Sequence, residues 1–258
     1  MGLLAMISEV EMKIPRFDIK YLFKYIFKQT LFRVFPGATV NVGPNVKIFN
    51  SKIIISPGAE VTIGPDVNIK NAEIYVERGC LRIDEFSLIQ GGNSHTRLLL
   101  VINDGKVSIG HHSKISCEKI WVRFGGNLTV GNYTNINKGS EIRCDERISI
   151  GSYNQISYRV KIWDTNTHNI LSKEERRIIA EKYYPYFGYE NSKPVTSAVS
   201  IGDDCWLSED TAILKGSQIG DGSIIGFRTT LAGKTVPSNS RVVQDIILKM
   251  SSIHNQSE

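Results

Sequence analysis

The sequence predicts an all-β solenoid, a parallel β-helix made of coils of three short strands. Ile-Gly occurs at Ile201, recurs after eighteen residues at Ile219 and after six more at Ile225, with Leu207 and Ile213 at the intervening steps of six. A six-residue apolar period fits neither a helix nor a plain strand. Gly or Asp after the apolar residue suits a corner, because both tolerate left-handed backbone angles. Coils of this kind stack into a parallel β-helix.

The same period runs through most of the chain. Coils are expected to start at Val42, Ile63, Ile83, Ile109, Val130, Ile150, Ile201 and Ile219. Steps of six from these starts predict inward apolar residues, and steps of twelve reach Ile54, Tyr75, Trp121, Ile142, Ile162, Ile213 and Leu231. The fourth residue after a start is small or modest, as an inward site beside a corner requires: Val46, Val67, Ser113, Thr134, Asn154, Cys205 and Ser223. Eight coils predict a prism about 40 Å long.

Two insertions interrupt the predicted stack. The first lies between residues 83 and 109 and contains the Gly-rich segment 91–96; the second is larger and covers 163–200. Loops this long in a compact domain are usually functional or disordered. Within the second, 172–182 is expected to form a short helix. The aromatic stretch 183–189 suits either the wall of a sugar site or a hydrophobic plug.

The chain is expected to divide into three parts: an N-terminal segment 1–36, a β-helix domain 37–240, and a C-terminal helix and tail 241–258. An amphipathic helix is predicted over 17–35, where lysines and an arginine alternate with apolar residues. It would cap the open end of the solenoid, pack on a neighbouring subunit, or lie as a basic anchor on a membrane surface.

Bulk properties exclude several function classes. The net charge of +5 includes no dense Lys/Arg block in the repeats, so nucleic-acid binding is not expected. The four cysteines form no CxxC and are expected to be buried thiols in a reducing compartment. No apolar run reaches the ~20 residues of a membrane span. We expect a cytoplasmic protein, with 17–35 as its means of peripheral contact at the inner membrane. The histidines do not repeat at coil spacing, so no metal site is expected.

Three residues are candidates for the chemistry of a site. His168 falls eighteen residues after Ile150, so it should leave the prism at a corner, where it acts either as a base or as a polar loop residue. His95, in the first insertion, is the next candidate base. Trp206 follows the inward Cys205 and should point outward, where it needs a ligand or another subunit as its partner.

The sequence resembles the hexapeptide-repeat acyltransferases, in particular sugar and capsular-polysaccharide O-acetyltransferases of the left-handed β-helix class. The resemblance covers about residues 100–240 and rests on Asp-Thr-Asn-Thr-His-Asn at 164–169, IGDDCWLSEDTAILKG at 201–216 and IGDGSIIG at 219–226. It implies a left-handed coil and a homotrimer with active sites between subunits. It also implies acetyl-CoA as co-substrate, no metal, and a glycan or sugar acceptor.

The resemblance implies a role for each site residue. His168 would be the general base that takes the proton of the acceptor hydroxyl, oriented by Asp164 or by a carbonyl. Trp206 would line the acceptor or thioester pocket. The backbone at Ser208 and Gly226 would face the pantetheine arm, and Lys234 would lie near the CoA phosphates. A backbone amide near residues 206–209 would stabilise the oxyanion.

The sequence departs from that family at three places. Ser208 stands where glycine is usual, Asn166 where an acid is frequent, and the Gly-Asn-Pro-Ala-Lys segment after the last coil is absent. These departures bear most on which residues bind the nucleotide end of CoA. N-acetylation of a nucleotide-linked amino sugar and a non-catalytic glycan-binding solenoid stay open as alternatives to O-acetylation.

Overall fold

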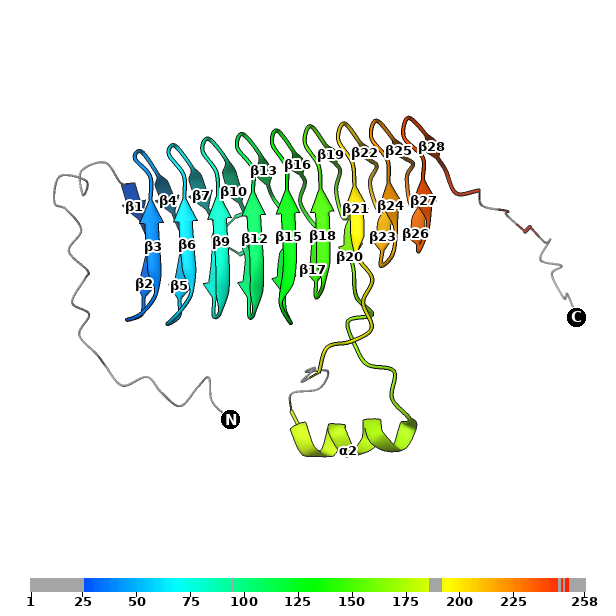
Figure 1. Ribbon diagram of the computed structural model, residues 1–258, viewed down its shortest axis with the longest axis horizontal. Helices are drawn as coiled ribbons and strands as arrows, with labels where there is room; N and C mark the ends of the chain where they lie inside the picture. Colours follow the sequence, from blue (N-terminus) through cyan, green and yellow to red (C-terminus); the bar gives the residue numbers. More distant parts are fainter. Residues whose placement is uncertain (1–25, 94, 186–191, 246, 248, 251–258) are drawn as a thin grey trace, which may run out of the picture.

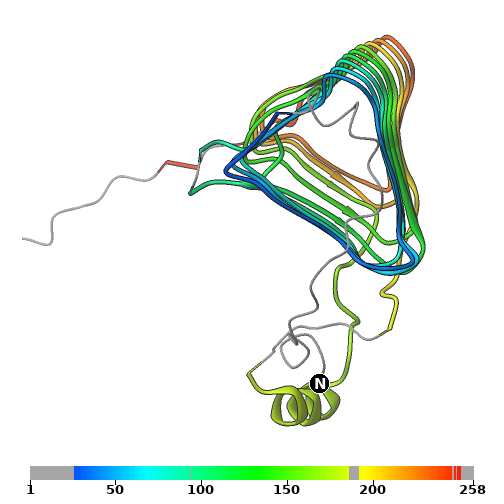
Figure 2. The ribbon, with the colours of Figure 1, turned by 90° about the vertical axis from the view of Figure 1, so that its left-hand side faces the viewer.

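A computed structural model describes residues 26–93, 95–185, 192–245, 247 and 249–250. These residues form a left-handed parallel β-helix with a triangular cross-section. Seen from its N-terminal end, the chain winds anticlockwise as it recedes from the viewer (Figure 2). The fold class predicted from the six-residue period is therefore confirmed, and so is the handedness that the resemblance implied.

Three parallel sheets form the faces of the prism (Figure 1). Sheet A contains β1 (Ile26–Lys28), β4 (Lys47–Phe49), β7 (Asn68–Lys70), β10 (Leu88–Gln90), β13 (Lys114–Ile115), β16 (Asn135–Ile136), β19 (Gln155–Ile156), β22 (Trp206–Leu207), β25 (Ile224–Ile225) and β28 (Arg241–Val242). Sheet B contains β2 (Leu31–Val34), β5 (Lys52–Ile55), β8 (Ala72–Val76), β11 (Leu98–Ile102), β14 (Lys119–Val122), β17 (Glu141–Cys144), β20 (Lys161–Trp163), β23 (Ala212–Leu214) and β26 (Thr230–Ala232). Sheet C contains β3 (Thr39–Val42), β6 (Glu60–Ile63), β9 (Gly79–Ile83), β12 (Gly105–Ile109), β15 (Gly126–Val130), β18 (Arg147–Ile150), β21 (Val199–Ile201), β24 (Gln218–Ile219) and β27 (Thr235–Val236).

Each coil runs through sheets A, B and C in turn, so the prism has an A–B, a B–C and a C–A corner. The first insertion leaves at the A–B corner, between β10 and β11, and the second at the B–C corner, between β20 and β21. The second carries the helix α2 (Lys173–Tyr183) away from the prism (Figure 1). Because β18 still pairs with β21 in register, the stack continues across this insertion.

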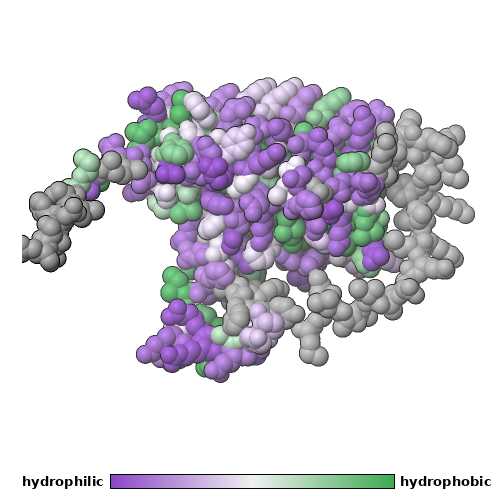
Figure 3. All heavy atoms as spheres, turned by 180° about the vertical axis from the view of Figure 1, so that it is seen from behind, coloured by the Kyte–Doolittle hydropathy of each residue, from purple (hydrophilic) through white to green (hydrophobic). Residues whose placement is uncertain are grey.

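The core is a set of columns in which each side chain lies over its equivalent in the next coil. The inward column of sheet A is almost entirely isoleucine: Ile48, Ile69, Ile89, Ile115, Ile136, Ile156, Leu207 and Ile225 are all buried. Burial of each such side chain contributes about 1.5–3 kcal/mol. The opposite faces of the strands carry the polar residues, and the surface seen from behind is mainly hydrophilic (Figure 3).

A second inward column, beside the C–A corner, is polar from the fourth coil onward. The hydroxyl of Ser113 donates to the Gly131 carbonyl at 2.8 Å, and that of Thr134 donates to the Gly151 carbonyl at 2.8 Å. The Asn154 amide nitrogen donates to the Gly202 carbonyl at 2.9 Å. These are the small inward residues expected four positions after each start, and burial of these polar groups is tolerated because they are hydrogen-bonded.

The step of twelve is wrong in three coils. Ile54, Tyr75 and Trp121 point outward and are half-buried, whereas the neighbours of Ile54, Ile53 and Ile55, are buried. The A–B corner of these coils is one residue shorter than in the coils where the step lands inward. A one-residue shift moves every side chain of a strand to the other face, so in these three coils the sheet B strand has the opposite alternation from the one predicted.

Both predicted terminal helices are corrected within the described residues. The stretch 26–34 forms β1 and β2 instead of the end of a helix; residues 17–25 lie outside the described residues. The Leu31 and Phe35 amides donate to the carbonyls of Ser51 and Ile55, so the edge of the second coil takes up this segment as strands. At the other end, residues 241–242 form β28 because the Gly226 amide donates to the Val242 carbonyl. The described residues that follow contain no helix, and sheet A has ten strands where eight coils were expected.

The predicted helix at 172–182 is confirmed as α2. The Ser172 hydroxyl accepts from the Glu175 amide and the Glu175 carboxylate accepts from the Ser172 amide, a capping box that begins the helix. None of its residues is buried. Within the described part of the chain, no helix combines the length and the apolar character needed to cross a membrane.

Three of the four cysteines are buried as expected, and Cys80 is the exception. All four are free. Cys80 lies half-buried on the outer face of β9, with its sulfur 3.6 Å from a Glu60 carboxylate oxygen. Partial burial and the Glu60 carboxylate raise the pKa of the Cys80 thiol.

Two glycines at the B–C corner of adjacent coils differ in how closely the next coil approaches them. Gly79 has φ +116°, and a methyl group there would collide with the Gly105 carbonyl oxygen; Gly58 has φ +78° with open space around it. Gly58→Ala should therefore lower the free energy of unfolding by about 1 kcal/mol through backbone strain alone, and Gly79→Ala by about 3 kcal/mol or more. Chemical denaturation measures both, and equal losses would contradict the packing argument.

Candidate functional site

The second insertion leaves the prism through a neck that begins at Asp164. The Asp164 side chain is fully buried. Its carboxylate accepts from the backbone amides of Asp145, Glu146 and Arg147 at 2.7–2.9 Å. Burial raises the pKa of the Asp164 carboxyl, and the three amide bonds oppose that shift. Asp164 thus ties the start of the insertion to the B–C corner of the preceding coil.

A buried ion pair holds the neck from the other side. The Arg123 guanidinium donates to both Asp145 carboxylate oxygens, at 2.9 and 2.7 Å. It also lies 3.5 Å from the Thr167 carbonyl oxygen and over the Trp121 ring, 4.3 Å from its centre. Bidentate pairs of this kind fix geometry as well as charge. Thr167 is the residue before His168, so this network determines where the backbone that carries His168 lies.

The returning strand of the insertion closes the neck. Thr165 and Thr196 form an antiparallel bridge, and the Ser197 amide donates to the Asp164 carbonyl at 2.9 Å. The Thr196 hydroxyl donates to the Glu146 carboxylate at 2.6 Å. His168 follows directly after this bridge and is exposed. An imidazole at the end of a braced neck is accessible to a substrate while its backbone is held in place.

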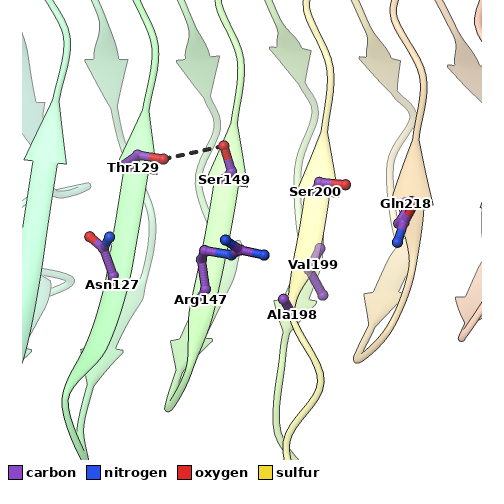
Figure 4. A pocket seen from close by; sticks show the side chains of 8 residues that line it. All are labelled: Asn127, Thr129, Arg147, Ser149, Ala198, Val199, Ser200 and Gln218. Carbon is purple, nitrogen blue, oxygen red and sulfur yellow. Dashed lines mark hydrogen bonds between the residues drawn. The ribbon is translucent and has the colours of Figure 1, made fainter.

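A shallow hollow of about 340 Å³ lies on the outer face of sheet C, beside the base of the insertion (Figure 4). Its wall is polar apart from Ala198 and Val199, and the residues that line it come from four consecutive coils: Asn127, Thr129, Arg147, Ser149, Ala198, Val199, Ser200 and Gln218. Arg147 lies near its middle. Since Asp164 holds the Arg147 amide, the hollow and the neck share one anchor.

The other predicted site residues lie elsewhere on the prism. Trp206 is 52% exposed on β22 of sheet A, so its outward orientation is confirmed. Ser208 and Gly226 lie at the A–B corner of successive coils, where the Ser208 amide donates to the Ile225 carbonyl. A side chain at Gly226 would crowd Val243. Lys234 is exposed at the B–C corner, two coils beyond the insertion.

A single chain therefore divides the predicted residues between two regions. The B–C corner carries Asp164, His168 and Lys234. Sheet A carries Trp206, and the A–B corner carries Ser208 and Gly226. Sheet A lies opposite the B–C corner of the triangle (Figure 2). The Asp164 carboxylate accepts from three backbone amides of the B–C corner, and these bonds hold the neck.

Sequence reasoning missed Arg123, Asp145 and Arg147. Arg123 and Asp145 each follow directly after the last inward residue of a sheet B strand, a place that Phe35, Ser56, Glu77 and Asn103 take in earlier coils. Nothing in the period shows that the two side chains meet. Among the described residues, no three His, Cys, Asp or Glu side chains gather as they would around a metal ion.

Comparisons with known proteins give weak matches. No protein-family model matches the chain. Over 118 residues it is 26% identical to the putative colanic acid biosynthesis acetyltransferase WcaF of Escherichia coli (strain K12), and the same figures hold for WcaF of Shigella flexneri. The match covers 46% of this chain and 54% of the relative. The chain thus spans about half the length of the curated relatives it matches.

Two solved structures match this chain over 91% and 90% of its length. The polySia-specific acetyltransferase NeuO is 18% identical, with a TM-score of 0.44 over 91% of this chain and 92% of that one. The polysialic acid O-acetyltransferase OatWY is 18% identical, with a TM-score of 0.49 over 90% and 93%. These values are too low to support an argument about activity.

The role of Asp164 in the neck can be tested by removing its acceptor. Asp164→Ala leaves three amides at the B–C corner without a partner, and we expect a loss of about 3 kcal/mol or more in the free energy of unfolding. Hydrogen exchange at residues 145–147 should accelerate. The control is Asp203→Ala, because this exposed carboxylate accepts from the Ser152 amide and should cost about 1 kcal/mol. Unchanged exchange at 145–147 would refute the role.

Proposed function

We propose that the protein is an acetyl-CoA-dependent O-acetyltransferase that modifies a hydroxyl of a bacterial surface polysaccharide or its sugar precursor. The observation that carries this proposal is the braced neck, which holds the backbone before His168 on an insertion whose base borders a polar hollow. The partial match to a putative colanic acid biosynthesis acetyltransferase supports the same reaction class. The hydroxyls, amides and single arginine of the hollow suit an acceptor rich in hydroxyl groups.

In the proposed reaction, the neutral imidazole of His168 accepts the proton of the acceptor hydroxyl while that oxygen attacks the thioester carbonyl. The tetrahedral intermediate then expels the CoA thiolate, which takes up the proton from the imidazolium. The carbon–sulfur bond breaks as the new ester bond forms, so the step needs no further reactant. The remaining rate enhancement comes from holding hydroxyl and thioester together.

The hydrogen bonds between coils limit which backbone amide can stabilise the oxyanion. The Trp206 and Ser208 amides donate to the Ser223 and Ile225 carbonyls of the next coil, so neither is available to a substrate. Leu207 pairs with Ile156 in the ladder of sheet A, so within 206–209 the amide of Glu209 is the candidate donor. Glu209 lies at the A–B corner, where an amide can face a bound ligand.

A second subunit would bring the two groups of residues together. The B–C corner of one prism and sheet A of the next are different surfaces, and a contact between different surfaces closes into a ring when its rotation allows. We propose a homotrimer in which His168 of one copy faces Trp206 of its neighbour. The 52% exposure of Trp206 in one chain agrees with a residue that awaits a partner. In this arrangement Ser208 and Gly226 would line the pantetheine arm and Lys234 the CoA phosphates.

The general base is tested by His168→Gln, with His95→Gln as the matched control. His95 is an exposed histidine of the first insertion, at the A–B corner. We expect the first change to lower kcat about 10²- to 10⁴-fold with an unchanged melting temperature, and the second to have little effect. The assay follows CoA release with acetyl-CoA and the surface polysaccharide of the producing bacterium, freed of its esters by mild alkali. Loss of activity in the control alone would move the base to His95.

The wild-type reaction itself decides between the reaction classes. No CoA release with any polysaccharide fragment or amino sugar would leave a non-catalytic glycan-binding solenoid. A product that resists mild alkali would show N-acetylation.

The shared site is tested by mixing two inactive variants. His168→Gln and Trp206→Ala each impair every site of a homotrimer. When the two are unfolded, mixed equally and refolded together, about a quarter of the sites should receive His168 from one chain and Trp206 from the next. Activity should return to that fraction of the wild-type value. If both residues served one chain's own site, mixing would restore nothing.

A further inference from the structure

A column of aromatic rings lies along the C–A corner. In each coil one corner residue has a positive φ, and in chain order these are Asn45, Asp66, Phe86, His112, Tyr133, Tyr153, Asp204, Gly222 and Asn239. The outer members of this series are Asn, Asp or Gly, the residues that adopt left-handed angles most readily. The four in the middle are aromatic, and we call Phe86, His112, Tyr133 and Tyr153 the ring column.

The rings of this column touch one another from coil to coil. Centroids of Phe86 and His112 are 4.9 Å apart, those of His112 and Tyr133 are 4.9 Å apart, and those of Tyr133 and Tyr153 are 5.1 Å apart. The two tyrosine rings are parallel to within 8°. The spacing follows the distance between neighbouring strands. His111 adds an edge contact to Tyr133.

The ring column combines strain with exposure. A bulky residue at positive φ is an outlier, and such strain gathers at functional sites. Stacking offsets part of it, yet Phe86, Tyr133 and Tyr153 remain 55%, 42% and 56% exposed. Core packing therefore does not explain why four coils carry rings where their neighbours carry Asn, Asp or Gly.

The ring column is continuous with the candidate site. Tyr133 follows β15, which contributes Asn127 and Thr129 to the hollow, and Tyr153 follows β18, which contributes Arg147 and Ser149 (Figure 4). The hollow reaches Ala198 at the base of the insertion. A polar strip thus leads across sheet C from the neck of His168 to the ring column.

We propose that the ring column and this strip bind a carbohydrate chain, with its reacting sugar at the B–C corner and later sugar units at the C–A corner. The exposed edges of the stacked rings offer apolar surface to sugar units, while the tyrosine hydroxyls, the imidazoles and Arg147 offer hydrogen-bonding groups. Apart from Ala198 and Val199 the hollow is lined by polar side chains, whereas the buried centre of a protein interface is more apolar, so the hollow suits a carbohydrate better than a second subunit. The proposal deepens the proposed function and relies on it only for the position of the reacting sugar.

The test measures binding separately from turnover. The probe is the de-esterified surface polysaccharide of the producing bacterium, cut into fragments of one repeating unit and of several. Tyr133→Asn/Tyr153→Asn removes two rings and installs a residue type that this corner already uses at Asn45 and Asn239, so the fold should be kept. We expect long fragments to bind about tenfold more weakly, single units to bind as before, and the melting temperature to hold or rise.

Two further variants separate the explanations. Phe49→Asn removes a ring that is 45% exposed on sheet A, outside the strip, and should leave binding unchanged. Tyr133→Phe/Tyr153→Phe keeps the stack without its hydroxyls and should give an intermediate loss.

Wild-type affinity of the double Asn variant for long fragments would overturn the proposal. A lower melting temperature with unchanged length preference would make the column structural, and a change of oligomer size in light scattering would make it a subunit contact; both also overturn it. Fragments that bind through the column without any CoA release would instead refute the acetyltransferase and leave the binding strip. If the double variant bound long fragments as the wild type does and acetyl transfer was observed, the binding strip would be refuted and the acetyltransferase would stand.

Discussion

The structure depends on one constraint: each coil must lie on the next in register. The strands of all three sheets are parallel, and their backbone hydrogen bonds join equivalent residues of successive coils. Side chains of one kind therefore form columns, as the isoleucines of sheet A and the polar residues beside the C–A corner do. A column is stable because each member packs on a near copy of itself, which is the physical basis of solenoid stability.

The same constraint explains how the chain carries a long insertion. Ile150 and Ile201 are Cα partners although fifty-one residues separate them, so the prism resumes after the insertion as though it were absent. The described contacts that hold the insertion to the prism lie at its base and include Asp164, the Arg123–Asp145 pair and the Thr165–Thr196 bridge. A buried ion pair is expensive unless well compensated. Here the bidentate geometry and the contact with the Thr167 carbonyl supply that compensation.

In a triangular prism, residues of successive coils can lie on different faces. Asp164 and Trp206 lie near each other in the coil order, yet one lies at the B–C corner and the other on sheet A. The strands fix the direction in which each side chain points, and a small movement of the chain cannot change it. A site that uses both groups has to be built between copies, whereas a site confined to the neck, the hollow and the ring column can belong to one chain.

The sequence by itself determined the solenoid, the inward column of sheet A, the places of both insertions, the helix α2 and the outward orientation of Trp206, because each follows from a short local period. Only the tertiary structure decided the rest. Residues 26–34 suit a helix by composition, but the exposed edge of the second coil makes them strands. One residue fewer at the A–B corner turns Ile54, Tyr75 and Trp121 outward, which a fixed step cannot show. The buried carboxylate of Asp164 and the stacked rings of the C–A corner arise from contacts between residues seventeen or more positions apart, and such contacts exist only once the coils are stacked.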